Sequence, residues 1–385
     1  MTDLPFIPLA IPNVGPAEGA NLQTCIDTNF VSTVGAFVGE FEQGVAELSG
    51  AAGGVAMGAG TMALHMSLHA LGVGRGDLVI LPSFTFIASA NSIAHTGAEP
   101  WLFDITDDWT LDPAQVADAL SRDTHRSGED LIHTPTGKRV AALMPVYTLG
   151  TPADMDSFRD IARKYRLPIV ADAAAAIGVT YRGEPIGPLA DLTCYSFNGN
   201  KTITSGGGGM VVGNDEALLK RIRHLSTTAR VSAAYEHDEV GYNYRMTNLQ
   251  AAVGVAQLGR LPDFLQTKRR IRETYDTAFR DLPGVSSFPY PTDRESACWF
   301  SGLVLDPGHP MSATEVCEAL RERRIEARVF WKPVHLQAPY ADAPRESMER
   351  SESTYTRIVT LPCSTLLTES DQARVVADVV DILGT

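Results

Sequence analysis

Seven short apolar runs, separated by amphipathic stretches, constrain the fold more than any other feature of this sequence. Runs of this length suit strands buried on both faces, and the stretches between them have the spacing of crossover helices. The pattern predicts an α/β fold with one mostly parallel, seven-stranded sheet between helices. The predicted strands are residues 54–57, 78–81, 100–103, 140–146, 168–171, 192–196 and 209–212.

The remaining segments predict a second, smaller unit. Residues 122–139 are dense in charge and turn formers, which predicts a surface excursion, and the helical pattern of residues 247–278 predicts one continuous bridging helix. The pattern resets after Pro283 and Gly284. We expect an N-terminal arm and a large domain with the bridging helix over residues 1–265, and a small α+β domain over 266–385. The small domain would hold a strand at 299–305 and helices at 312–323 and 370–383.

Charge and cysteine usage narrow the range of partners. The 46 acidic and 32 basic residues leave a formal charge of −14, which would repel nucleic acid and an anionic membrane surface. Five widely spaced cysteines without C-x-x-C favour neither disulfides nor zinc. The first sixteen residues carry an acid, and Pro8, Pro12 and Pro16 break their apolar stretch, unlike a signal peptide; no apolar window is long enough to span a bilayer. These features predict a cytoplasmic protein.

A glycine turn at residues 58–61 directly follows a predicted strand and precedes an apolar helix. Such a turn, with Gly60, Thr61 and Met62 at its end, directs backbone N–H groups and the positive helix end toward an anion, most plausibly a phosphate. An ATPase P-loop is excluded because no Gly-Lys-Ser/Thr follows, and the dinucleotide fingerprint is incomplete. A plain turn without a ligand is the alternative.

His65 and His69 lie one helical turn apart, but without the H-E-x-x-H glutamate they are predicted to pack or face solvent rather than bind metal.

Asp172 lies at the carboxyl end of a predicted inner strand. A carboxylate is costly to bury there unless a cation meets it, and a protonated ring nitrogen would serve. The alternative is an acid satisfied by backbone groups or by an arginine.

Lys201 follows a predicted strand, in a loop of small polar residues that ends in four glycines. A lysine amine in a closed site forms a Schiff base with an aldehyde or ketone when its pKa is lowered. Together with Asp172 and the glycine turn, it supplies the parts that pyridoxal 5′-phosphate (PLP) requires, with Thr61 and Ser196 binding the phosphate. Phe86 is the candidate for the aromatic face against the ring, the alternative being a core phenylalanine.

The sequence resembles the DegT/DnrJ/StrS group of nucleotide-sugar aminotransferases over nearly its whole length. The resemblance implies an aspartate-aminotransferase-like fold, in which Lys201 binds PLP and moves the proton, Asp172 pairs with the ring nitrogen and Phe86 stacks on the ring. Thr61, the Met62 backbone and Ser196 would hold the phosphate, and Asn243 would reach the phosphate site of the neighbouring subunit in a homodimer with shared sites. The motifs are residues 7–12, 58–61, 81–86, 152–156, 196–201, 241–248 and 333–335.

Within that group, three segments are most similar to the branch that acts on UDP-4-keto-6-deoxy-N-acetylhexosamines, the sugars of bacillosamine and legionaminic acid type. They are residues 82–91, 197–201 and 237–244. Two positions depart from the common pattern. Ala175 stands where many members have a glutamine or glutamate, and Tyr147 stands where many have a histidine.

The sequence thus predicts transamination of a nucleotide-linked 4-ketosugar with L-glutamate as the amino donor. Arg245, Arg328 and His335 are candidates for contacting the sugar nucleotide or the donor carboxylate. Three alternatives are a PLP enzyme acting on a 3-ketosugar or cyclitol ketone, a PLP-binding sensor without turnover, and a nicotinamide dehydrogenase. The retained lysine and the absence of an added DNA-binding module disfavour the sensor, and the incomplete glycine fingerprint disfavours the dehydrogenase.

Overall fold

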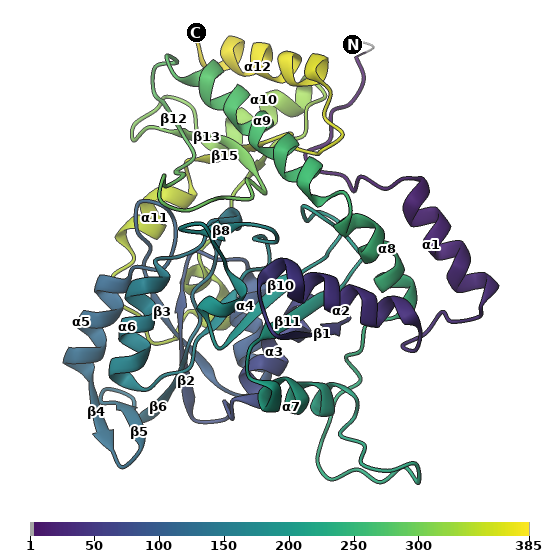
Figure 1. Cartoon of the computed structure of the whole chain (residues 1–385). Helices are drawn as coiled ribbons and strands as arrows, with labels where there is room; N and C mark the ends of the chain where they lie inside the picture. The colour runs from purple at the N-terminus through teal and green to yellow at the C-terminus, as the bar shows by residue number, and fades with distance from the viewer. Residues whose placement is uncertain (1–3, 385) are drawn as a thin grey trace.

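All seven predicted strands form, but the structure divides them between two sheets. The structure is a computed structural model that describes residues 4–384 (Figure 1). A four-stranded sheet has the order β1-β11-β10-β7, and a five-stranded sheet has the order β3-β2-β6-β5-β4. Pairing is parallel for β7 with β10 and for β2 with both β3 and β6, whereas β11 is antiparallel to both its neighbours. The seven strands are β1 (Gly53–Met57), β2 (Asp77–Pro82), β3 (Glu99–Phe103), β6 (Lys138–Leu143), β7 (Val170–Asp172), β10 (Leu192–Ser196) and β11 (Gly209–Gly213).

The expected single sheet is interrupted between β6 and β7. Only isolated parallel bridges link these segments, at Leu143 with Ile169 and at Val146 with Asp172. Pro145 and Pro168 lie in this stretch and accept hydrogen bonds through their carbonyls, yet neither has an N–H to donate. The strand predicted at 140–146 therefore ends at Leu143.

The segment at 122–139, predicted to be a surface excursion, instead extends the sheet. It forms the hairpin of β4 (Thr124–Ser127) and β5 (Asp130–His133), and β5 pairs antiparallel with β6. Gly128 takes a φ of +61° in the tight turn, a backbone conformation that glycine adopts without a steric penalty. Charge density in this segment reflects the exposed faces of an edge hairpin.

Helices cover both faces of these strands because alternate strand residues point to opposite sides. In β2, Leu78 and Ile80 belong to a core shared with α2, α5 and α6, whereas Val79 and Leu81 belong to a core shared with α3, α4 and α7. The helices are α2 (Ala36–Ser49), α3 (Gly60–Ala70), α4 (Ile87–His95), α5 (Pro113–Asp123), α6 (Met155–Tyr165) and α7 (Glu216–Ser226).

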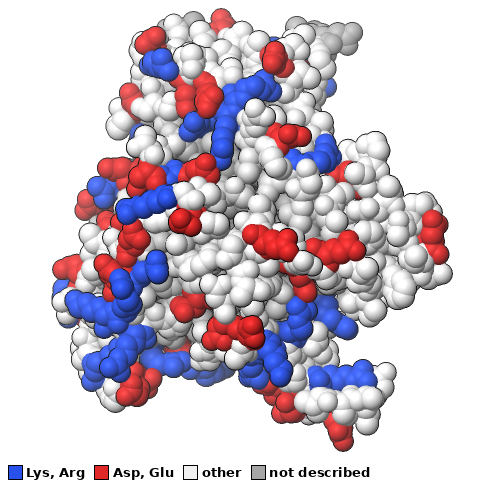
Figure 2. Space-filling view, in the orientation of Figure 1, with Lys and Arg blue, Asp and Glu red and all other residues white. Residues whose placement is uncertain are grey.

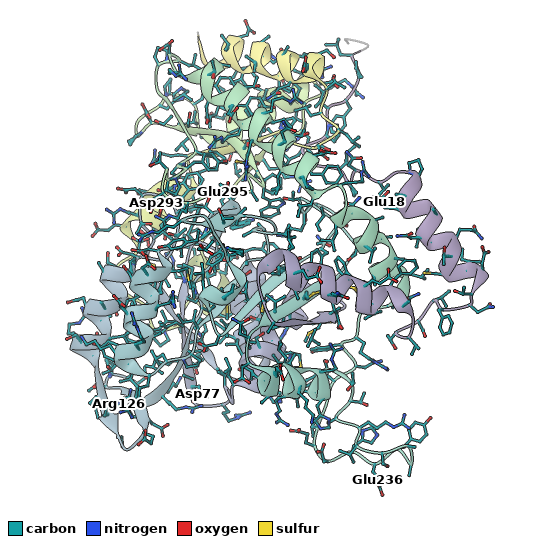
Figure 3. The ribbon with its side chains drawn as sticks, in the orientation of Figure 1. Glu18, Asp77, Arg126, Glu236, Asp293 and Glu295 are labelled. Atoms are coloured by element: carbon teal, nitrogen blue, oxygen red, sulfur yellow. The ribbon has the colours of Figure 1, made fainter. Side chains whose placement is uncertain are left out.

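The predicted bridging helix is two helices rather than one. α8 (Asn248–Leu258) and α9 (Leu261–Phe279) are separated at Gly259 and Arg260, and Pro262 occupies the first turn of α9, where a missing N–H costs nothing. α1 (Pro16–Asp27) runs beside α8 (Figure 1). Its buried Glu18, labelled in Figure 3, pairs with Arg260 at 3.0 Å and so ties the N-terminal arm to the break.

The C-terminal part forms its own antiparallel sheet, with strand order β12-β13-β15-β14. Its core joins this sheet to α9, α10 and α12, at the top of Figure 1. The boundary predicted at residue 265 lies inside α9 and stays a prediction. Its elements are β12 (Val285–Ser287), β13 (Ser301–Leu305), β14 (Arg328–Val329), β15 (Ile358–Leu361), α10 (Ala313–Glu322), α11 (Glu349–Tyr355) and α12 (Glu369–Leu383).

The surface carries both signs of charge close together. On the face drawn in Figure 2, Lys and Arg side chains are interspersed with Asp and Glu. Surface ion pairs include those of Arg122 with Asp118 and with Glu346. No helix within residues 4–384 combines the length and the apolar character needed to cross a membrane. A two-stranded hairpin of β8 (Thr180–Tyr181) and β9 (Glu184–Pro185) completes the strands of the described chain.

Candidate active site

A cavity of about 550 Å³ lies where the ends of the central strands meet the C-terminal part. Arg294 pairs with Asp108 at 2.6 Å across this junction. Its neighbours in the sequence, Asp293 and Glu295, are labelled in Figure 3. Most of the residues singled out from the sequence line the cavity, whereas Met62, Asn243, Arg245 and His335 do not. Those that line it are Gly60, Thr61, Phe86, Asp172, Ser196, Lys201 and Arg328.

One wall of the cavity is the start of α3. Its N-cap residue is Ala59, which offers no side-chain acceptor to the first N–H groups of the helix. Gly60 is required by close packing, because a Cβ there would lie 2.8 Å from the Ser196 Cβ. The uncapped helix end and the hydroxyl-bearing Thr61 and Ser196 therefore fit a phosphate group.

Asp172 lies at the end of β7 and is almost completely buried. Its Oδ2 accepts a hydrogen bond from Ser89 Oγ at 2.7 Å, and its Oδ1 accepts one from the Ala174 N–H at 3.1 Å. Since Ser89 has a single proton, Thr85, at 2.9 Å, donates to Ser89 in turn. Burial raises the pKa of Asp172, while Ser89, Ala174 and Lys201 oppose that rise.

No cation within 4.0 Å pairs with Asp172 among the residues that the structure describes. Of the groups expected from the alternative, a backbone N–H is present, that of Ala174, and no arginine pairs with Asp172 in the described chain. A buried carboxylate held by two donors, with no cation in direct contact in the described chain, fits a protonated pyridine nitrogen.

Lys201 follows β10 in a loop whose turn is closed by its own N–H, which donates to Asn198 O at 3.0 Å. Its Nζ lies 3.6 Å from the centre of the Trp299 ring and makes no hydrogen bond or ion pair with any residue from 4 to 384. Burial lowers the pKa of this amine to about 8, with Asp172 acting in the opposite direction. A substantial neutral fraction near physiological pH is what nucleophilic and proton-transfer roles require.

Several cavity residues escaped the sequence reasoning. Ser89 lies in the first turn of α4 and Thr85 lies just before that helix, and their four-residue separation could have linked both to a strand-end acid. Trp299 had no local signal in the sequence, because it lies in the C-terminal part.

Phe86, which was singled out from the sequence, is 54% exposed. Its ring lies 5.9 Å from that of Trp331 at the cavity wall.

Both departures from the family pattern line the cavity. The Tyr147 hydroxyl is buried without a hydrogen-bond partner in the described chain, and burial raises its pKa. Ala175 presents only a methyl group to the same cavity. Neither residue supplies the polar contact that the usual histidine or amide would make.

The remaining candidates lie elsewhere. His335 is buried between Ser83 Oγ, at 2.6 Å from its Nδ1, and Glu352, at 3.0 Å from its Nε2, so it joins the C-terminal part to the end of β2. Asn243 and Arg245 are exposed on the segment between α7 and α8, whose far end carries Glu236 in Figure 3.

Two more predicted residues can be placed. Arg328 lines the cavity but hydrogen-bonds Glu326. His65 does not join His69 in a metal-binding group within residues 4–384; its Nδ1 lies 3.3 Å from Tyr244 Oη, and burial lowers its pKa to about 4.

The fold and this cavity define an aminotransferase of the PLP-dependent class. A comparison with protein families matches residues 12–380 to the DegT/DnrJ/EryC1/StrS aminotransferase family, and the chain belongs to that family. It is a PLP-dependent sugar aminotransferase, as its relatives are.

Named relatives cover the whole chain. It is 37% identical to the GDP-perosamine synthase of Caulobacter vibrioides over 100% of both chains, and 34% identical to that of Vibrio cholerae over 93% of this chain and 94% of the relative. Among solved structures, DesV of S. venezuelae is 30% identical with a TM-score of 0.85, over 96% of this chain and 94% of that one. The resemblance to the family expected from the sequence is confirmed, but the relatives do not single out the UDP-hexosamine branch.

Proposed function

We propose that this enzyme transfers the amino group of L-glutamate to a nucleotide-linked 4-ketosugar. The observation that carries the proposal is the Lys201 amine, which faces the cavity without a hydrogen-bond partner in the described chain. Asp172, in the same cavity, has no cation within 4.0 Å among the described residues. A buried amine and a buried carboxylate without such partners lower the stability of the protein by itself. They are useful only when a cofactor contacts both.

Each residue has a defined part in this proposal. Bound PLP supplies an electron sink for the reacting carbon. Lys201 holds the cofactor and moves a proton at its Nζ, and Asp172, oriented by Ser89, keeps a proton on the ring nitrogen. Phe86 covers one face of the ring.

The phosphate would be held at the start of α3. Thr61, the Met62 backbone and Ser196 would supply donors there, with Gly60 allowing the close approach. Asn243 would complete the phosphate site of a neighbouring subunit, in a homodimer with shared sites. Support for that assembly comes from the exposed apolar side chains on the segment that carries Asn243, namely Val231, Tyr235 and Val240.

The nucleotide is proposed to be GDP. Two relatives that cover nearly all of this chain are named GDP-perosamine synthase. UDP-4-keto-6-deoxy-N-acetylhexosamine is the second candidate, because residues 82–91, 197–201 and 237–244 resemble enzymes of that branch. Arg245 and Arg328 remain candidates for binding the diphosphate or the donor carboxylate, whereas the burial of His335 between Ser83 and Glu352 favours a structural role.

Absorption spectroscopy tests the first half of the reaction. With added PLP, the purified enzyme should show a visible cofactor band that disappears on adding L-glutamate, and one equivalent of 2-oxoglutarate should form. Lys201→Ala should not show this response. If the wild type shows no cofactor band, the assignments of Lys201 and Asp172 are wrong.

A substrate panel tests the second half. The glutamate-treated enzyme is mixed with GDP- and UDP-linked 4-ketosugars, and return of the visible band identifies the acceptor. A return with the UDP compound alone would overturn the choice of GDP while leaving the aminotransferase assignment intact.

A further inference from the structure

Trp299 is fixed at every polar atom it has. Its N–H donates to Leu149 O at 3.1 Å, and its indole Nε1 donates to Asn200 O at 2.6 Å, in the loop that carries Lys201. Its carbonyl accepts from Lys268 Nζ at 2.9 Å. Only 4% of the residue is exposed. The ring is thus held in one orientation by three separate segments of the chain.

Lys268 secures this arrangement from α9. It is 3% exposed, and its Nζ donates to the carbonyls of Trp299 and Cys363, at 2.9 and 2.6 Å. No carboxylate lies within 4.0 Å of it in the described chain. Burying an amine costs free energy unless its protons find acceptors; the acceptors here are the Trp299 and Cys363 carbonyls and the Cys363 sulfur, so Lys268 fixes the backbone of both residues.

The face of the Trp299 ring meets the Lys201 amine at 3.6 Å. A tryptophan face carries negative potential and attracts an ammonium, whereas it attracts a neutral amine far less. Among the residues that the structure describes, the charged group that acts on this amine is Asp172, from β7. The ring gives the Lys201 Nζ a cation–π contact, and no hydrogen bond or ion pair holds this atom within the described chain.

We propose that Trp299 is a positioning residue of the reaction, whose ring holds the unattached Lys201 amine in the cavity and favours its protonated form. The proposal rests on the role proposed above for Lys201. Because Trp299 precedes β13, the C-terminal part supplies this contact to a lysine in the loop after β10 of the four-stranded sheet. Correct seating of the two parts would then be a condition for proton transfer.

The test reads the acid–base behaviour of Lys201 directly, in the full-length chain freed of PLP. Acetic anhydride reacts with the neutral amine, so mass spectrometry of the labelled peptide gives the pH midpoint for Lys201, with exposed Lys220 as an internal reference. Tryptophans carrying one or two ring fluorines then replace all four tryptophans, which weakens the negative ring face with little change of shape.

The midpoint of Lys201 should fall with each added fluorine while that of Lys220 stays constant. Trp299→Leu should give the full shift, roughly 0.5 to 1.5 pH units downward, and Trp299→Phe a smaller one. An unchanged midpoint in the fluorinated proteins would overturn the proposal. So would an upward shift in Trp299→Leu, which would mean that the ring only excludes water.

The fluorinated proteins keep the test decisive even where Trp299→Leu does not fold. Since no cofactor or substrate enters the measurement, its result is separate from the result of the absorption test. An enzyme that fails with glutamate can still show the midpoint shift, and an active enzyme can still lack it.

Discussion

Two lysines contact Trp299, and their surroundings differ completely. Lys268 donates to two carbonyls and contacts the indole residue only at its backbone oxygen. Lys201 has no hydrogen bond in the described chain and contacts the ring face instead. One amine lies in a packed interior and the other borders a cavity of about 550 Å³.

The difference separates a structural amine from a reactive one. The Lys268 Nζ has hydrogen-bond acceptors in two carbonyl oxygens and the Cys363 sulfur, which hold it in place. An amine that is desolvated without acceptors has a depressed pKa, which is about 8 for Lys201. Two lysines that contact the same tryptophan thus have different roles: Lys268 is structural and Lys201 is reactive.

The largest expected effect comes from removing the reactive amine. Lys201→Ala should lower the rate of glutamate conversion at least about a thousandfold, since it removes the proposed proton carrier and cofactor attachment. Its free energy of unfolding without PLP should change by less than about 1 kcal/mol, because no hydrogen bond is lost. Stopped-flow absorbance and urea unfolding measure the two quantities. A variant that retains a tenth of the wild-type rate would show that Lys201 is not the reactive amine.

Lys268→Met should show the reverse pattern. The Trp299 and Cys363 carbonyls lose their donor, so the free energy of unfolding should fall by about 2 kcal/mol. Glutamate conversion should slow less than tenfold, because Lys201 is retained and Trp299 keeps its hydrogen bonds to Leu149 and Asn200. Urea unfolding measures the loss, and Lys220→Met, on the exposed face of α7, is the matched control. Equal stability of the two variants would show that Lys268 has no structural role.

The strands were predictable from sequence because each is a local pattern. All seven apolar runs became strands, and the helix expected after the glycine turn is α3. What failed were the joins. The helix break at Gly259 and the interruption of the sheet between Pro145 and Pro168 were missed, because both depend on which backbone donors face a neighbouring segment. The hairpin of residues 124–133 was missed because it depends on pairing with β6.

The site was predictable to the same extent. Lys201, Asp172 and the start of α3 follow strands of one sheet region, where strand ends are expected to converge. Trp299 and Lys268 reach the cavity region from the C-terminal part and α9, and no spacing rule relates them to Lys201. The aromatic contact could be found only once the two parts were placed together.

The third and smallest effect concerns the buried acid, the counterpart of Lys201 in the cavity. Because burial raises the pKa of Asp172, the folded chain binds its proton more tightly than the unfolded chain. Ionising Asp172 therefore costs stability as the pH rises from its ordinary value near 4 to its raised value in the fold. Without PLP, Asp172→Asn should gain stability relative to the wild type across this window and hold a constant advantage above it.

Urea unfolding at a series of pH values, with and without PLP, measures this difference. The exposed Asp342→Asn is the matched control and should follow the wild type. With PLP present, the sign should reverse, since only the carboxylate can pair with a protonated ring nitrogen, and the wild type should then gain more stability than Asp172→Asn. A pH-independent difference without PLP would mean that Asp172 is satisfied by Ser89 and Ala174 alone, and that the cavity is not built around a missing cation.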